Sequence, residues 1–309
     1  MAEPLRPMST GELLDRTFAI YKQHFALFLG IALPAPTLYL LLQLIRIEWF
    51  LRHSGLHGGN VFMRPQVLWF WVSVLLVWLL GIAFVNPPTI RAVSAVHLGR
   101  EISVTESYRA LRGRVLTVTG IVARWMGPVI LGTVAGFVGI VIVGTIIELS
   151  SVSLGLSSFI SSLMVGFLAL VTMVVAVLLV WVRYALAIQV CVVEDLGAAA
   201  SVRRSKSLTQ GSVVKIAVIY LMVLVIGMVV SFTLTYAARY VSLPMHSARL
   251  LGILNAVGGF VSGALTSPLA TIAMSLVYYD ERVRKEGFDL QLMMVVLDEP
   301  HADAAFLVT

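Results

Sequence analysis

Basic side chains gather in two short segments of this 309-residue chain, and their spacing is the first feature that suggests chemistry. One segment carries Arg109, Arg112 and Arg114, and the other carries Arg203, Arg204 and Lys206. At 100° per residue the second segment forms an amphipathic helix with a weakly apolar face and a basic face. A Lys or Arg near an anionic membrane surface contributes about 1 kcal/mol of attraction. We expect these residues to contact anionic lipid headgroups or a protein partner. The alternative is that they serve only to orient the chain in the membrane and bind nothing.

A second group with chemical potential is a run of hydroxyl side chains in an otherwise apolar stretch near the C-terminus. Thr266, Ser267 and Thr271 surround Pro268. A proline bends a helix, and hydroxyls beside a bend can line a polar cavity. We expect such a cavity here if the chain binds or moves a small molecule. The alternative is that the hydroxyls donate to their own helix backbone.

Two glycine pairs have the four-residue spacing that lets membrane helices approach closely. They are Gly132 with Gly136, and Gly259 with Gly263. Such pairs bring helix backbones together in apolar surroundings. We expect them to pack helices within one bundle, and the alternative is the face of a homodimer.

No catalytic or metal-binding pattern stands out. The chain lacks HExxH, GxSxG and Walker A motifs. Its single cysteine, Cys191, permits no intrachain disulfide. His53 and His57 are four residues apart, but glycines beside them disfavour a helix and a third ligand is missing. We therefore expect no catalytic residues, no metal and no cofactor.

The elements that carry these residues are indicated by composition. The chain is 59% hydrophobic and only 12% charged, whereas soluble domains carry about 25% charged residues. Several apolar runs are long enough to cross a hydrocarbon core about 30 Å thick. The net charge of +6 is explained by the positive-inside rule and anionic lipids, so no nucleic-acid partner is expected.

We predict an all-α integral membrane protein with a six-helix transmembrane bundle and short amphipathic cytoplasmic helices. Residues 1–24 form a cytoplasmic interfacial helix, whose start carries the capping box Ser9 to Glu12. Pro34 and Pro36 bend the first span, and Asn86-Pro87-Pro88 ends the second. Residues 115–125 and 184–193 are apolar segments that are either interfacial helices or extensions of spans. Residues 280–309 form a cytoplasmic tail, and the six-span domain of residues 25–279 has its spans near 25–45, 67–85, 126–147, 159–182, 213–236 and 254–278.

Orientation follows from the distribution of arginine and lysine. Fifteen lie in the N-terminal segment, the second and fourth loops and the tail, against five on the other side. This bias places both termini in the cytoplasm, at the cell membrane. In the second loop Ser103 and Glu106 form another capping box. In the fourth, Asp195 is expected to cap the basic helix and Gly211 to end it.

Four stretches also carry a family likeness: LRPMSTGELLDRTFAIYKQHF, LGREISVTESYRALRGR, VVEDLGAAASVRRSKSLTQG and SPLATIAMSLVYYDERVRKEGFDLQL. In this order they resemble the bacterial and archaeal membrane proteins of the glycerophosphoryl diester phosphodiesterase membrane-domain family, over most of residues 5–292. The resemblance implies a six-span protein of the cytoplasmic membrane. Residues 280–309 are too few for the soluble phosphodiesterase barrel found in some members, so it implies no enzymatic activity.

The sequence thus predicts a non-enzymatic multi-pass membrane protein that binds anionic headgroups or scaffolds a partner through its basic cytoplasmic face. The alternative is a transporter or lipid-translocating protein for a small or amphipathic substrate, which requires a cavity at membrane depth. The predicted spans contain no ionisable residue at their centres, which argues against a proton-driven pump. A lipid-modifying enzyme is the least favoured of the three.

Overall fold

A computed structural model describes residues 7–53, 65–97, 99–111, 113–153, 166–168, 171–172, 178, 181–245 and 247–287. These residues form helices and short connections, with no β-strand among them. The all-α prediction is therefore confirmed for this part of the chain.

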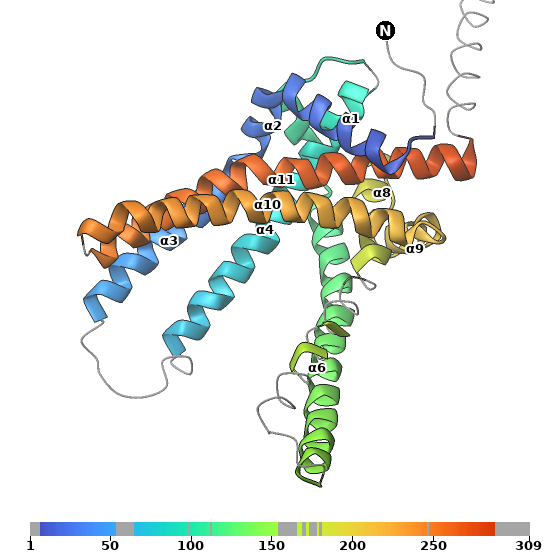
Figure 1. The fold of residues 1–309 in the computed structure, drawn as a ribbon. Coiled ribbons are helices and arrows are strands. Elements are labelled where there is room, and N and C mark those ends of the chain that lie inside the picture. Colours follow the sequence, from blue (N-terminus) through green and yellow to red (C-terminus); the bar gives the residue numbers. More distant parts are fainter. Residues whose placement is uncertain are drawn as a thin grey trace, which may run out of the picture.

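Two long antiparallel helices form the centre of the fold. α10 (Val213–Ser242) and α11 (Ala248–Glu286) lie side by side and are joined by the short helix η3 (Leu243–Met245) (Figure 1). In the most apolar part of α11, 61% of the residues are buried, compared with 17% in α10. α11 is therefore the inner helix, while α10 presents much of its apolar surface outward.

The N-terminal helices cover one side of α11. α1 (Thr10–Gln23) begins at the expected capping box, in which Ser9 accepts from the Glu12 backbone N–H and Glu12 accepts from that of Ser9. α1 buries Leu13 and Ile20, and the Tyr21 hydroxyl donates to the Leu265 carbonyl at 2.9 Å. α1 is thus anchored along α11 (Figure 1).

The first predicted span is two helices rather than one. α2 (Phe25–Ala32) and α3 (Pro34–His53) meet at Leu33 with a bend of 44°. Pro34 lacks the N–H that would bond to the carbonyl four residues earlier. The bend expected at the prolines is confirmed, and it lies at the start of α3.

The second span does not stop where the sequence suggested. α4 (Pro65–His97) continues through Pro87 and Pro88, so the prediction that Asn86-Pro87-Pro88 ends the helix is wrong. Each proline removes one backbone hydrogen bond. However, Ala83, Thr89 and most of the residues between them are buried, and packing outweighs local helix propensity.

The remaining elements are α5 (Val104–Tyr108), η2 (Arg109–Leu111), α6 (Val115–Ser153), α8 (Ala187–Val193) and α9 (Ala198–Thr209). Residues 115–125 are continuous with the predicted third span, so they extend it. α6 leads away from the α10–α11 pair in Figure 1. Most of the predicted fourth span, residues 159–182, lies outside the described residues.

The caps in the two basic loops differ from one another. Ser103 accepts from the Glu106 backbone N–H at 3.2 Å, as expected. Asp195, in contrast, does not cap α9, whose N-cap is Gly197. Arg114 holds the Asp195 carboxylate at 2.9 Å, which removes it from the helix terminus. Gly211 follows the end of α9 with a φ of 86°, a conformation suited to glycine.

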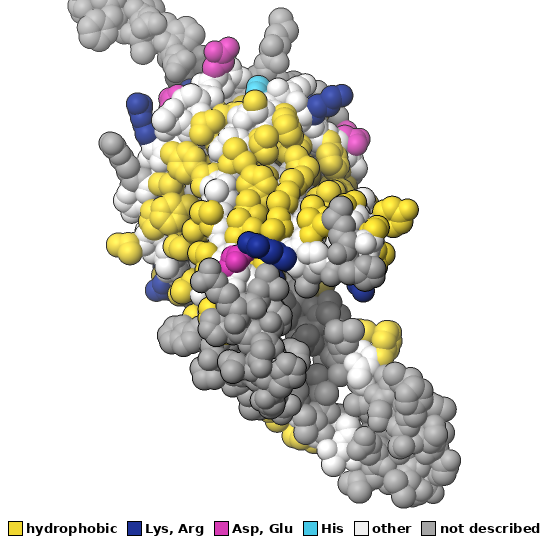
Figure 2. All heavy atoms as spheres, turned by 90° about the vertical axis from the view of Figure 1, so that its left-hand side faces the viewer, with side chains coloured by type: hydrophobic (Ala, Val, Ile, Leu, Met, Phe, Trp, Pro, Cys, Tyr) yellow, Lys and Arg dark blue, Asp and Glu magenta, His cyan; other side chains and the backbone are white. Residues whose placement is uncertain are grey.

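Four described helices are long and apolar enough to cross a membrane, and the bent α2–α3 pair would make a fifth. Hydrophobic side chains cover most of the described part of one face of the molecule (Figure 2). These features are compatible with a multi-pass membrane protein. The single spans lie at Val72–His97, Val115–Gly132, Val213–Ser242 and Arg249–Glu286.

Candidate functional site

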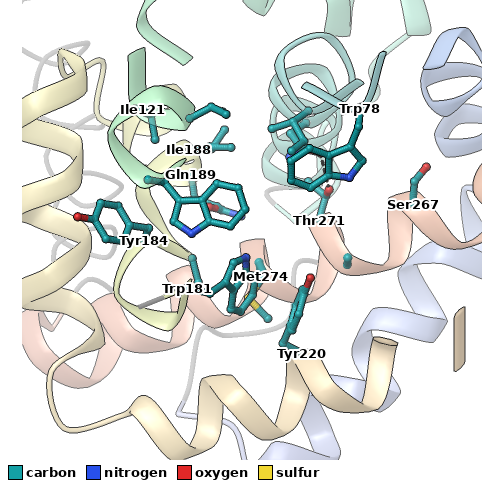
Figure 3. A pocket seen from close by; sticks show the side chains of 16 residues that line it. Trp78, Ile121, Trp181, Tyr184, Ile188, Gln189, Tyr220, Ser267, Thr271 and Met274 are labelled. Carbon is teal, nitrogen blue, oxygen red and sulfur yellow. Dashed lines mark hydrogen bonds between the residues drawn. The ribbon is translucent and has the colours of Figure 1, made fainter. Parts of the chain in front are cut away.

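A cavity of about 290 Å³ lies between α4, α6, the apolar helix Trp181–Val193, α10 and α11. We call it the aromatic cavity, because five large rings line it: Trp78, Trp125, Trp181, Tyr184 and Tyr220. Figure 3 shows rings from several of these elements converging on one space. Three of the six tryptophans of the chain are therefore concentrated at one place.

The rings pack against one another in pairs. The Trp78 and Trp125 centroids are 5.9 Å apart and tilted by 39°, which joins α4 to α6. Those of Trp181 and Tyr220 are 3.6 Å apart and tilted by 33°. Such contacts hold large rigid side chains in place around the cavity.

The polar groups of the aromatic cavity are all uncharged. Besides the tyrosine hydroxyls and tryptophan N–H groups, they are the side chains of Asn86, Gln189, Ser267 and Thr271. Thr271 donates its hydroxyl to Asn86 Oδ1 at 3.1 Å, which connects α11 to α4. Gln189 Oε1 and Trp125 Nε1 are buried and have no hydrogen-bond partner within the described part of the chain. No Asp, Glu, Lys, Arg or His of that part lines the cavity.

A second cavity of about 340 Å³ adjoins the first, between α3, α4 and α11. We call it the apolar cavity, since aliphatic and ring carbons form most of its wall. Trp78, Ile82, Asn86 and Ser267 line both cavities. The two spaces therefore meet at a shared wall.

The predicted hydroxyl residues divide between two roles. Ser267 and Thr271 line the aromatic cavity, as the hypothesis of a polar cavity requires. Thr266 lies outside both cavities and donates to the Ser262 carbonyl at 2.8 Å, which is the alternative role.

The two glycine pairs occupy different surroundings. Gly259 and Gly263 line the apolar cavity, where added Cβ atoms would lie 3.5 Å from Tyr39 and 3.4 Å from Pro36. This pair lies where α11 meets α3. An added Cβ at Gly132 or Gly136 meets no described heavy atom within 4 Å. Packing of this pair within the bundle therefore stays a prediction, as does the alternative of a homodimer face.

The predicted basic residues also separate into two groups. Arg114 pairs with Asp195, and Arg204 pairs with Glu194 at 3.1 Å and with Glu286. Burial alone lowers the pKa of Arg204, but the two glutamates outweigh it and raise the pKa. These two arginines hold the fold together and are not freely available to lipid.

Three of the other predicted basic residues face outward. Arg109 and Arg203 are exposed, and so is Lys206, whose ammonium lies 5.0 Å from the centre of the Tyr184 ring. Arg112 lies outside the described residues.

Sequence reasoning missed a charged cluster at the end of α11. It consists of Asp280 and Glu281, which are almost fully buried, and of Lys215, Arg284 and Lys285. Lys215 and Arg284 both contact the Asp280 carboxylate, and Lys285 lies 3.3 Å from Glu281. The expected boundary at residue 280 therefore falls inside a helix. The four-residue spacing of opposite charges was the available signal.

The same cluster binds the N-terminal segment. The Met8 backbone N–H donates to Asp280 at 2.6 Å, and its carbonyl accepts from Arg284 at 2.6 Å. Lys285 also donates to the Gln210 carbonyl after α9. With the Arg114–Asp195 pair, these contacts bring all four predicted cytoplasmic segments to one end of the molecule. Arg249, which was predicted to lie on the side of the membrane away from the cytoplasm, pairs with Glu48 at 2.5 Å.

The described residues contain no group of three or more His, Cys, Asp and Glu side chains that could hold a metal ion. His57 lies outside them. Comparison of the chain with protein-family models, with curated proteins and with solved structures finds no match. The resemblance to the glycerophosphoryl diester phosphodiesterase membrane-domain family therefore remains a prediction.

Proposed function

We propose that this chain is a multi-pass membrane protein that binds one amphipathic molecule, of the lipid class, in its paired cavities. The observation that carries the proposal is their shared wall at Trp78, Ile82, Asn86 and Ser267. One side of this wall offers rings and uncharged polar groups, and the other offers mostly hydrocarbon. An amphiphile has the same division into head and chain.

Size and position support this proposal. Together the cavities fall within the range of about 300–1,000 Å³ that is usual for small-molecule sites. They lie among helices that are apolar enough to span a bilayer, so a lipid can reach them without crossing water. Binding is the step for which the geometry argues, and translocation of the bound molecule would use the same cavities.

Native mass spectrometry of the full chain, extracted into nanodiscs from its own membrane, tests the proposal. Wild-type protein is expected to retain a lipid-class molecule at a fixed stoichiometry. Ala270→Phe fills the aromatic cavity and is expected to lose it. Ala237→Phe makes the same change on the exposed side of α10 and should retain it. A wild-type protein that carries no such molecule would refute the proposal.

A second candidate function is contact of the basic face with anionic headgroups or a protein partner. It is supported by the exposure of Arg109, Arg203 and Lys206. Replacing Arg109, Arg203 and Lys206 together with glutamine should weaken binding to anionic liposomes and reduce the salt dependence of that binding. Arg239→Gln is the control, because Arg239 lies in the last turn of α10, whereas α9 precedes the first turn of that helix. Unchanged liposome binding by the triple variant would eliminate this candidate.

We also propose that the end carrying the charged cluster faces the cytoplasm, with both termini on that side of the cell membrane. The convergence of four basic segments supports this orientation. In a Cys191→Ala background, a cysteine at Ser207 should resist an impermeant thiol reagent in intact cells, and one at Tyr240 should react. The reverse pattern would contradict the orientation.

A further inference from the structure

A cation stands at the edge of the aromatic cavity. The ammonium of Lys206 lies 5.0 Å from the centre of the Tyr184 ring, and this ring is part of the cavity wall. The preceding residue fixes this part of α9, because the buried Ser205 donates its hydroxyl to the Arg183 carbonyl at 3.0 Å. Lys206 is therefore held beside the segment that contributes Tyr184 to the wall.

The charge of Lys206 has no counter-charge in the described part of the chain. Arg204, on the same helix, pairs with Glu194 and Glu286. No described carboxylate forms an ion pair with Lys206, whose ammonium contacts the Tyr184 ring. An ammonium has three donor hydrogens, so this contact leaves donors for an oxyanion. Lys206 is also exposed, so an anion bound there keeps part of its hydration and avoids the cost of a buried charge.

The cavities and Lys206 follow one another in a fixed order. In Figure 3, Tyr184 and Ser267 lie on opposite sides of the aromatic cavity. Ser267 belongs to the wall shared with the apolar cavity, whereas Tyr184 does not line that cavity. The space thus has hydrocarbon at one end and a cation at the other, with rings and uncharged polar groups between them. Trp and Tyr side chains are typical of the membrane–water interface, where lipid heads lie.

We infer that the amphiphile bound in the paired cavities carries an anionic head, a phosphate or a carboxylate, which accepts hydrogen bonds from the Lys206 ammonium beside Tyr184. This inference rests on the proposed function and names the substrate class. The hydrocarbon chain of the ligand then passes the rings and reaches the apolar cavity. A cationic head is disfavoured because Lys206 would repel it, and an uncharged head would leave Lys206 without a counter-charge.

Binding of matched probes to the full chain in a non-ionic detergent tests this inference. The probes share one dibrominated acyl chain, which quenches tryptophan fluorescence, and carry a phosphate, carboxylate, methyl ester or choline head. The two anionic probes are expected to bind about fivefold more tightly than the methyl ester, since one Lys beside an anionic group contributes about 1 kcal/mol. The choline probe is expected to bind no more tightly than the methyl ester. The ratio between the two anionic probes distinguishes a phospholipid-type head from a fatty-acid-type head.

Variants then assign the preference to Lys206. Lys206→Gln should remove the preference and leave binding of the methyl ester unchanged, whereas Lys206→Arg keeps the charge and should retain the preference. Lys22→Gln is the matched control, because Lys22 is an exposed lysine in the last turn of α1 and lines neither cavity. This control removes the same charge from the protein and should leave the preference intact.

The outcomes separate this inference from the proposed function. Equal binding of the anionic and methyl ester probes by the wild-type protein, or tightest binding of the choline probe, would overturn the anionic head and retain an amphiphile site. A preference that survives in Lys206→Gln, or that falls equally in Lys22→Gln, would overturn it as well, since the net charge of the protein would then suffice. No saturable quenching by any probe would overturn the proposed function itself.

Discussion

Replacing Lys215 with methionine removes the least exposed cation from the charged cluster. The Asp280 side chain is fully buried, and the Lys215 side chain is 18% exposed. The same carboxylate also contacts Arg284, whose side chain is 41% exposed. One carboxylate thus has one sheltered and one exposed cation, so the structure provides its own control.

The expected magnitudes follow from this difference. Breaking a buried ion pair from one side costs about 3–5 kcal/mol, because the remaining charge is left without compensation. Asp280 keeps Arg284 and the Met8 N–H, which places Lys215→Met near the lower end, at about 3 kcal/mol. Arg284→Met removes a cation that water screens more, because its side chain is 41% exposed, and its expected cost is about 1 kcal/mol or less.

Cys191 makes the assay simple. It is the only cysteine of the chain and is 1% exposed, so a thiol-reactive dye reports unfolding. At roughly 2–4 °C per kcal/mol, Lys215→Met should lower the melting temperature by about 6–12 °C and Arg284→Met by far less. Lys215→Met combined with Asp280→Leu should recover much of the loss, because it removes both charges. Equal shifts for the two single variants, or no recovery in the double variant, would refute this reasoning.

Three further predictions concern other parts of the structure. Burial raises the pKa of the Cys191 thiol, so the folded state favours the neutral thiol. The stability that this contributes is fully present below the pKa of the thiol in the unfolded chain, near 8.5, and is lost as the pH rises above it. Thermal melting followed by tryptophan fluorescence should show this loss, and Cys191→Ala should reduce it. Gly252→Ala places a Cβ 3.1 Å from Ile47, which should destabilise the α3–α11 contact by about 1–3 kcal/mol, whereas Gly127→Ala, with open space around it, should not. The exposed Arg249–Glu48 pair should contribute no more than about 1 kcal/mol in a double-mutant cycle, and its effect should fade in high salt.

Local patterns predicted local structure well. The capping box at Ser9 needs only residues three apart, and the bend before Pro34 follows from one missing N–H. The stop at Pro87 and Pro88 was wrong because burial of the surrounding turn outweighs local preference. Interactions over a few residues can be read from sequence until tertiary packing opposes them.

The candidate site could be predicted only in part for the same reason. Ser267 and Thr271 were found through their own spacing, whereas Trp78, Trp181 and Tyr220 come from elements far apart in the chain and share no pattern. Asp280 and Glu281 were assigned to a cytoplasmic tail, because runs of charge are usually solvated. Their burial depends on Lys215 and on the Met8 backbone, which no local spacing reveals.

The bond between the Met8 N–H and Asp280 joins residues 272 positions apart. At about 5–20 residues per second, synthesis of the intervening chain takes roughly 15–55 s. Throughout that time α1 exists without the helix that buries Leu13 and Ile20, so the membrane surface or a chaperone must cover its apolar face. α1, the first helix of the described chain, is thus among the last to reach its final contacts, and variants of the charged cluster should accumulate as inserted chains with a protease-sensitive segment around α1.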